Sequence, residues 1–473
     1  MSMRRVVLRT EPAAVSTALV ALREELQLPL DFPAEVQVAA TEAVRAGAAG
    51  ERVDRTDIAF VTIDPPGSLD LDQAMALERT DTGFVIRYAI ADVGAWVTPG
   101  SPLDTESWAR GETLYFPDLR IPLYPPSLSE GAASLLPNVD RPAVVWTLTV
   151  DATGELTHTQ VERATVRSRE RCDYATVQAK LDAGTADPWV SVLAEVGRLR
   201  VAAQRARGGA DMRVPEQQVD VAPDGTATLS YRASLPLEEW NAQISMLTGI
   251  AAAGLMMRAR VGLLRTLPAP DARSLAHFRR TAHALGVAWA EGTSYDEVLA
   301  RLDPNDAHQA ALLAQAPPLF RGAGYQAFDG APPVDPGHAG VGADYAHATA
   351  PLRRLADRYV SDLCVALSAG SPIPQHVREA LPRLPEAMAS SGHRAHAVDR
   401  AVVDLVEALL LAGHIGETFD AVVVDSEDHS AVVQLTDPAV RAKVPQPLPL
   451  GARVQVTVTA ADPATRTVTF VQS

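Results

Sequence analysis

The sequence predicts an α+β protein with three parts, a small helical module at residues 1–50, a domain of β-sheet and surrounding helices at 51–413, and a small β-barrel at 414–473. Three observations support this prediction. At 473 residues the chain exceeds one ordinary domain. Strand-like and helix-like segments are grouped rather than strictly alternating, which favours α+β over a doubly wound sheet. Residues 414–473 consist of short strand-like runs separated by turn residues.

Two helices are expected in the N-terminal module. Residues 12–26 carry apolar side chains at helical spacing. A second helix is expected from about Asp31, with Pro33 in its first turn, to Gly47–Gly50. Two such helices can form a helix-turn-helix or a packing cap. Because no recognition helix is recognisable, we favour the cap.

The central domain begins with strands and continues with helices. The β-rich runs are Phe60–Ile63, Phe84–Ala91 and Val144–Val150. Residues 188–320 are rich in alanine and leucine and are expected to be helical, with a strand-like insertion near 208–228.

Two segments complete the chain. Residues 351–413 are again expected to be helical. The barrel at 414–473 fits an OB-fold, the commonest small barrel of this size, although periodicity alone also allows another small β-domain.

Composition limits the classes of protein to which the chain can belong. Hydrophobic residues make up 47% and charged residues 21%, as in a globular protein. There is no apolar run of about 20 residues and no signal-peptide core, so we expect a cytoplasmic protein that needs no membrane and no obligate protein partner. The net charge of -16 argues mildly against a protein that coats nucleic acid. An enzyme that threads one strand needs only a locally positive channel.

The segment TIDPPGSLDLDQA at 62–74 brings three carboxylates close together. Asp64 ends a hydrophobic strand, a proline–glycine turn follows, and Asp70 and Asp72 then lie two residues apart. If the chain is extended there, the last two carboxylates share one face. Oxygen ligands suit Mg²⁺ or Mn²⁺, and such a site suits phosphodiester hydrolysis. A lone D-x-D would be read as a solvated acidic turn, but the flanking strands and the turn favour a metal site.

A second segment, APLRRLADRYV, carries three arginines after a glycine-containing loop. Pro351 is expected to open a helix with Arg353, Arg354 and Arg358 in its first turns. Arginines at a helix N-terminus form a phosphate site, because the helix dipole and the guanidinium groups act together. The alternative is a surface helix with ordinary ion pairs.

Together these segments resemble the RNB catalytic domain of the RNase II and RNase R family of exoribonucleases. The aspartate segment is similar to that family's signature of an aspartate, a gap and D-x-D-D-A. The resemblance covers residues 51–413, and the barrel is similar to the family's OB-type RNA-binding domain. Further blocks follow in the same order: AIADVGAWV (89–97), TLYFPDLRIPLYPPSLSEGAASLLPNVDR (113–141), RGGADMRVPE (207–216) and YAHATAPLRR (345–354).

The resemblance implies a Mg²⁺-dependent hydrolase, with Mn²⁺ as a substitute, that shortens single-stranded RNA from its 3′ end and releases nucleoside 5′-monophosphates. It assigns the metal to Asp64, Asp70 and Asp72, and makes Asp72 indispensable for cleavage. The fourth acidic position of the signature is Gln73, whose carbonyl oxygen can still serve as a ligand but carries no charge.

The resemblance also implies the residues that hold RNA. Arg353 falls on the arginine that stabilises the scissile phosphate, and Arg354 follows it in the same block. Tyr115 falls on the aromatic side chain that stacks near the terminal nucleotide. Asp399 stands where the family has a glutamate near the 3′ end, so the charge is kept and the reach is shorter.

Two alternative functions remain open. Gln73 is compatible with a catalytically impaired RNB-like protein that only binds RNA, but Asp64, Asp70, Asp72 and Arg353 are all retained. A helix-turn-helix regulator that binds DNA is disfavoured by the acidic net charge and by the aspartate cluster.

Overall fold

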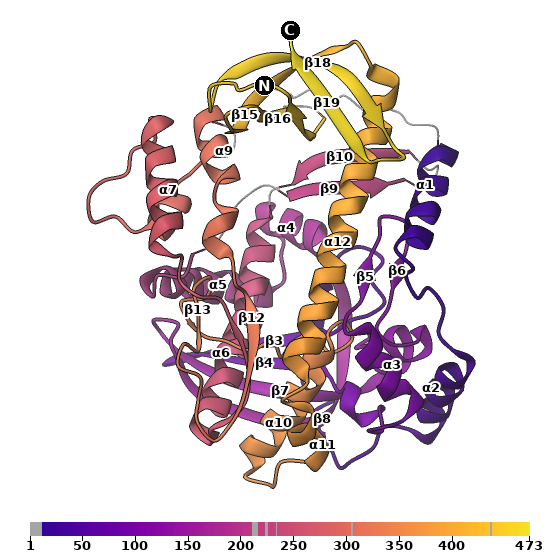
Figure 1. The fold of residues 1–473 in the computed structure, drawn as a ribbon. Helices are drawn as coiled ribbons and strands as arrows, with labels where there is room; N and C mark the ends of the chain where they lie inside the picture. The colour runs from indigo at the N-terminus through magenta and orange to yellow at the C-terminus, as the bar shows by residue number, and fades with distance from the viewer. Residues whose placement is uncertain (1–11, 211–215, 223–225, 233, 304–305, 436–437) are drawn as a thin grey trace.

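The two expected N-terminal helices are present and pack against different parts of the molecule (Figure 1). The structure, a computed structural model, describes residues 12–210, 216–222, 226–232, 234–303, 306–435 and 438–473. Helix α1 (Pro12–Glu25) packs against the long helix α12, and α2 (Ala34–Ala46) packs against α3 (Pro102–Arg110). Because each helix is part of a larger interface, the geometry agrees with a packing cap. Pro33 lies just before α2 rather than inside its first turn.

A six-stranded sheet forms the centre of the domain at residues 51–413. Its strand order is β1-β8-β2-β3-β4-β7, and β8 also pairs with β7. Residues 156–167 of β8 pair with β7, whereas residues 168–173 pair with β2, so this long strand joins both edges of the sheet. The strands are β1 (Val53–Asp54), β2 (Phe60–Asp64), β3 (Gln73–Thr80), β4 (Gly83–Ala91), β7 (Asp140–Asp151) and β8 (Leu156–Asp173).

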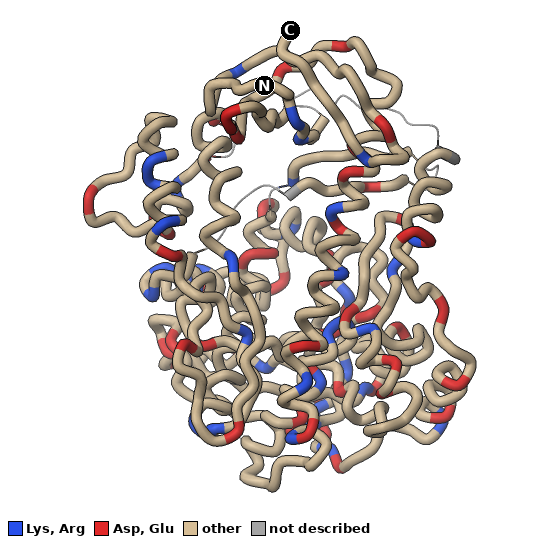
Figure 2. Tube along the Cα trace, in the orientation of Figure 1, with Lys and Arg blue, Asp and Glu red and all other residues tan. Residues whose placement is uncertain are grey.

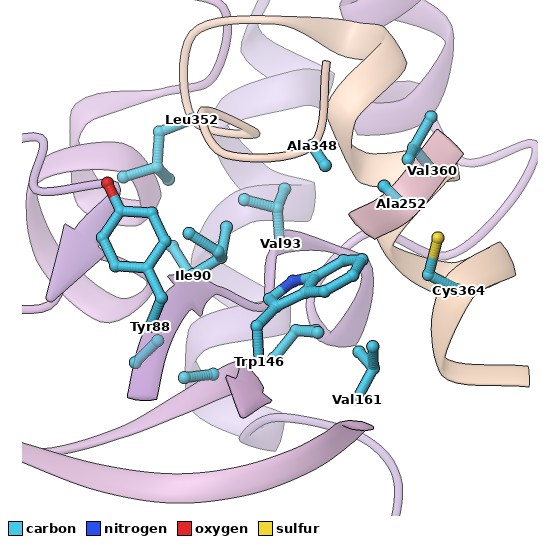
Figure 3. Close-up of a cluster of buried hydrophobic side chains, with 14 of the residues drawn as sticks. Tyr88, Ile90, Val93, Trp146, Val161, Ala252, Ala348, Leu352, Val360 and Cys364 are labelled. Atoms are coloured by element: carbon cyan, nitrogen blue, oxygen red, sulfur yellow. The ribbon is translucent and has the colours of Figure 1, made fainter. Parts of the chain in front are cut away.

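Helices α6 (Pro236–Ala259) and α10 (Leu355–Ala369) cover one face of the sheet and bury its apolar side chains (Figure 3). Trp146 of β7 lies at the centre of this core and is fully buried. Leu352, three residues before α10, also lies in this core. Packing of Leu352 therefore holds the loop before α10 against the sheet.

Helix α12 (Leu384–Leu411) runs from the sheet to the C-terminal barrel (Figure 1). The barrel is closed, in the order β15-β16-β17-β19-β18, which confirms the predicted small β-barrel of the OB type. Its apolar interior forms one core with α1 and α12. Its strands are β15 (Thr418–Ser426), β16 (Ala431–Leu435), β17 (Arg441–Val444), β18 (Arg453–Asp462) and β19 (Thr467–Gln472).

Shorter elements connect these parts. The remaining helices are α4 (Tyr174–Asp182), α5 (Pro188–Ala206), α7 (Ala272–Ala284), α8 (Tyr295–Leu299), α9 (Ala307–Ala314) and α11 (Gln375–Ala380). The remaining strand pairs are β5 (Leu114–Tyr115) with β6 (Arg120–Ile121), β9 (Glu216–Val221) with β10 (Ala227–Arg232), β11 (Val261–Thr266) with β12 (Gly324–Asp329), and β13 (Gly337–His338) with β14 (Ala343–Asp344).

Two local predictions were wrong. The segment expected to be helical contains strand β11, whose aliphatic residues pair with β12. The helix expected from Pro351 begins only at Leu355, because Arg354 is extended and forms a β-bridge with Glu112. The strand-like insertion near 208–228 is present as β9 and β10, whereas residues 211–215 of the block RGGADMRVPE lie outside the described residues.

Candidate active site

The aspartate segment follows β2 and leads directly into β3. Asp64 is the last residue of β2, and a turn begins with the hydrogen bond from Ser68 N to Pro65 O (3.2 Å), with Gly67 at a φ of 83°. Leu71 is fully buried, and its N–H donates to Ser134 Oγ at 2.9 Å. Burial of this leucine holds the two flanking aspartates in place, although they lie in a loop rather than in a strand.

Asp72 is the most enclosed carboxylate of the segment. Its Oδ1 accepts a 2.7 Å hydrogen bond from Leu352 N, and its Oδ2 lies 3.8 Å from Arg353 Nε. Burial raises the pKa of Asp72 to about 8, because the charged form loses its hydration, although Arg353 and the Leu352 amide oppose this shift. Burial, and then the charge of Asp70, raise the pKa of Asp64 to about 7. One buried and one half-buried carboxylate, both with raised pKa values, lack sufficient positive charge nearby, and a divalent cation would supply it.

Asp70 has a cationic partner of its own. Arg120 of β6 binds the Asp70 carboxylate and also contacts Glu130 Oε1 at 2.9 Å. Within the described part of the chain, no three His, Cys, Asp or Glu side chains are grouped closely enough to hold a metal ion. The all-oxygen donor set and the underneutralised Asp64 and Asp72 nevertheless fit Mg²⁺ or Mn²⁺.

The side chain of Gln73 lies between two protein groups. Its Nε2 donates to Thr349 O at 2.6 Å, and its Oε1 accepts from the Tyr88 hydroxyl at 2.6 Å. The oxygen that was expected to bind metal therefore already has a hydrogen-bond donor.

Only one of the three arginines expected at a phosphate site presents its guanidinium beside Asp72. The Arg353 side chain is 45% exposed. Arg354 instead donates to both oxygens of the buried Asp357, at 2.8 and 3.0 Å, and Arg358 is buried against Asp104. Since the backbone at Arg354 is extended, the side chains of Arg353 and Arg354 leave the loop in different directions.

Tyr115 lies on a segment that is bonded to the arginine loop. Thr113 N donates to Arg353 O at 3.0 Å, and Tyr115 pairs with Arg120 in the β5–β6 ladder. The tyrosine side chain is exposed, and it lines a cleft of about 930 Å³ between this ladder, α12, β9 and β17. Asp399 of α12 lines the same cleft.

The cleft carries both signs of charge. Its basic residues are Arg400, Arg441 and Lys443, and its acidic residues are Asp399, Asp404 and Glu407. Lys and Arg are interspersed with Asp and Glu over the chain, including along α12 (Figure 2). The structure thus brings Asp64, Asp70, Asp72, Gln73, Arg353 and Tyr115 into one contiguous region, while Asp399 lies in the cleft that Tyr115 also lines.

Sequence reasoning missed several residues of this site. Arg120, Tyr88 and Leu352 gave no signal in the sequence, since their contacts with Asp70, Gln73 and Asp72 depend on the tertiary fold.

The fold defines a class of protein, one in which a sheet domain carries a cluster of aspartates and a closed five-stranded barrel follows at the C-terminal side. Residues 52–368 match the RNB domain, and residues 417–473 match the RNase II-type exonuclease C-terminal S1 domain. The chain therefore belongs to the RNase II and RNase R family of RNB-domain exoribonucleases.

Curated relatives extend beyond this chain. Ribonuclease R of Escherichia coli is 31% identical over 360 residues, which are 72% of this chain and 43% of the relative. The Arabidopsis thaliana exosome complex exonuclease RRP44 homolog A is 29% identical over 333 residues, or 67% of this chain and 35% of the relative. The chain thus spans less than half the length of these two relatives.

Solved structures share the fold at low sequence identity. The apo form of Mycoplasma genitalium RNase R has a TM-score of 0.86 at 18% identity, over 98% of this chain and 78% of that one. Yeast Ssd1, a pseudonuclease, has a TM-score of 0.65 at 17% identity, over 93% of this chain and 53% of that one. Since a pseudonuclease has this fold, activity has to be argued from the site residues.

None of the helices in the described residues is long and apolar enough to cross a membrane.

Proposed function

We propose that this protein is an active Mg²⁺-dependent exoribonuclease that hydrolyses single-stranded RNA from the 3′ end and releases nucleoside 5′-monophosphates. The observation that carries the proposal is the buried Asp72, with Arg353 beside it and a cationic deficit around Asp64 and Asp72. A protein that only binds RNA has no need to maintain the buried Asp72 and the half-buried Asp64 at a site short of positive charge.

In this proposal Asp64, Asp70 and Asp72 hold Mg²⁺ or Mn²⁺. When bound, the metal supplies an activated water and stabilises the leaving oxygen. Arg353 contributes charge to the phosphate as negative charge develops, because its guanidinium is exposed and lies next to Asp72. The Leu352 N–H orients the Asp72 carboxylate.

The proposed RNA path uses the cleft between the β5–β6 ladder, α12, β9 and β17. Tyr115 offers an aromatic face for stacking near the 3′ end, and Asp399 lies across the same cleft. Mycoplasma genitalium RNase R has been solved with ribose methylated single-stranded RNA and with double-stranded RNA, which supports an RNA substrate here by family likeness. We assign the barrel at 414–473 to RNA binding, the module at 1–50 to packing, residues 51–413 to catalysis, and the activity to the cytoplasm.

The test is incubation of the purified protein with 5′-labelled single-stranded RNA, with Mg²⁺ or with a chelator. We expect progressive shortening from the 3′ end and release of mononucleotides only with the metal. Asp72→Asn should reduce kcat by roughly 100-fold or more while RNA binding is kept, because the asparagine retains the acceptor for Leu352 and loses the charge.

The matched control is Asp81→Asn, an exposed aspartate in the turn after β3. It should turn over RNA like the wild type. The competing function, RNA binding without cleavage, is motivated by Gln73 and by the likeness to Ssd1. A wild-type protein that binds the RNA and leaves its length unchanged in Mg²⁺ and Mn²⁺ would establish that alternative.

A further inference from the structure

We propose that Gln73 is a positioning residue rather than a metal ligand. Its amide fastens the loop of residues 349–353 to β3, and so holds Arg353 beside Asp72. This inference rests on the proposed exoribonuclease function and deepens it. It assigns to residue 73 a hydrogen bond that an ionised carboxylate could not donate.

The hydrogen bonds around Gln73 have a single consistent direction. The Thr349 carbonyl oxygen can only accept, so the nitrogen of the amide must face it. The amide oxygen then faces Tyr88, whose single hydroxyl hydrogen is donated to it. The Tyr88 oxygen lies 2.8 Å from Ser245 Oγ, so the serine hydroxyl is the donor of that pair. The chain of donors runs from α6 through β4 and β3 to the loop.

Only an amide satisfies both neighbours at position 73. Thr349 is 4% exposed, and Tyr88 is fully buried. An aspartate or glutamate would accept from Tyr88 but would offer no donor to the Thr349 carbonyl, which it would also repel. Leaving a buried acceptor unsatisfied is costly, and a facing charge adds to the cost. The hydrogen bond that the amide donates to Thr349 O thus explains why this chain has Gln73 where the family signature has an acidic residue.

The loop of residues 349–353 carries the two groups that contact Asp72. Leu352, whose N–H donates to Asp72 Oδ1, and Arg353 follow Thr349 by three and four residues. The loop has two further anchors, from Ala350 N to Asp357 Oδ1 at 2.7 Å and from Thr113 N to Arg353 O at 3.0 Å. Gln73 is the side chain that joins the loop to β3 directly beside Asp72. A displacement of about 1 Å at such a site can reduce catalysis roughly 100-fold.

The experiment uses the full chain with Gln73→Glu, Tyr88→Phe and the double variant. Gln73→Glu keeps the size of the side chain and its acceptor for Tyr88, but replaces the donor to Thr349 with charge. The matched control is Gln204→Glu, because Gln204 likewise donates to a backbone carbonyl, Gly340 O at 2.8 Å, and accepts from a side chain, Gln243 Nε2 at 2.7 Å. The four readouts are kcat and KM on single-stranded RNA, Mn²⁺ affinity without RNA by electron paramagnetic resonance, amide exchange of residues 346–354, and Tm.

We expect Gln73→Glu to reduce kcat roughly 10- to 100-fold, to leave KM and Mn²⁺ affinity within about threefold, and to speed amide exchange in the loop. Tyr88→Phe should reduce kcat less, and should add little in the Gln73→Glu background, because both variants break one hydrogen-bond chain. Gln204→Glu should match Gln73→Glu in its effect on Tm without the loss of kcat.

Tighter Mn²⁺ binding by Gln73→Glu with kcat retained would show that position 73 is a ligand and would overturn the inference. Unchanged loop exchange would overturn it as well. If the wild type proves inactive on RNA, the proposed function fails, while amide exchange and Mn²⁺ affinity still decide whether Gln73 fastens the loop.

Discussion

Arg353 and Arg354 are neighbours in the chain, but their guanidinium groups contact different carboxylates, those of Asp72 and Asp357. The Arg353 side chain is 45% exposed and its Nε lies 3.8 Å from Asp72 Oδ2. The Arg354 side chain is 18% exposed and binds Asp357, which is fully enclosed. The extended backbone at Arg354 separates the two directions. Because the two arginines make different contacts, we expect alanine substitution to have a different effect at each.

Arg353→Ala should reduce kcat roughly 100- to 1000-fold with little change in RNA affinity. Charge developing on one phosphate falls on few groups, whereas affinity is shared among many phosphate contacts. Single-turnover rates and equilibrium binding on the same RNA provide the comparison. Arg79→Ala, which removes an exposed arginine paired with Glu195, is the control and should keep its rate. Equal losses of binding and rate would make Arg353 a docking residue.

Arg354→Ala should chiefly destabilise the fold. It leaves the buried Asp357 carboxylate without its cation, and breaking such a pair costs about 3–5 kcal/mol. Denaturant unfolding measures the change, with Arg353→Ala as the matched control that should lie close to the wild type. A wild-type midpoint for Arg354→Ala would mean that Asp357 is satisfied by its bond from Ala350 N alone.

These two arginines also show what the sequence could predict. The motif identified Arg353 and Arg354 as a pair, but it could not separate their roles, because the difference arises from the β-bridge between Arg354 and Glu112. Local periodicity correctly predicted the two N-terminal helices and the barrel, whose patterns are complete within each element. It missed β11, an aliphatic run in which period alone does not separate strand from helix.

In the candidate site too, the sequence predicted what depends on neighbouring residues and not what depends on distant ones. The aspartate spacing predicted a compact group of carboxylates, and Leu71, which lies between Asp70 and Asp72, is buried in the main hydrophobic core. The environment of each carboxylate depends on distant residues. Arg120 approaches Asp70 from β6, and Leu352 approaches Asp72 from a loop 280 residues further along the chain. Such contacts leave no trace in spacing or composition, so the expected ligand role of Gln73 could not be weighed against its two hydrogen bonds.

Arg120→Leu should lower the Mg²⁺ concentration that gives half-maximal activity. Arg120 binds the Asp70 carboxylate, so a metal at this site must compete with a positive charge. Removing that charge should strengthen metal binding by about 1 kcal/mol, or about fivefold. A Mg²⁺ titration on single-stranded RNA measures the midpoint, and Arg167→Leu, whose partner is the exposed Asp140, is the control. An unmoved midpoint would indicate that Asp70 is not a ligand.

Glu407 should make the stability of the protein depend on pH. This residue of α12 faces the barrel, where its Oε1 accepts from Gln217 Nε2 at 2.6 Å and from Arg441 N at 2.9 Å. Burial raises the pKa of Glu407 to about 7, because the charged form is poorly hydrated, although these two donors oppose the shift. The folded protein therefore binds a proton more tightly than the unfolded chain does. The stabilisation is fully present below the unfolded pKa, near 4.5, and is lost as pH rises towards 7.

Glu407→Gln should remove this dependence. Glutamine keeps the acceptor for Gln217 and Arg441 and carries no charge, so the variant should equal the wild type at pH 4.5 and exceed it in unfolding free energy at pH 8. Each unit of pKa difference corresponds to about 1.4 kcal/mol. Denaturant unfolding at several pH values measures the difference, with Glu417→Gln, which changes an exposed glutamate, as the control. A constant difference between Glu407→Gln and wild type across this range would mean that Glu407 stays ionised, because the donors on its Oε1 then outweigh its burial.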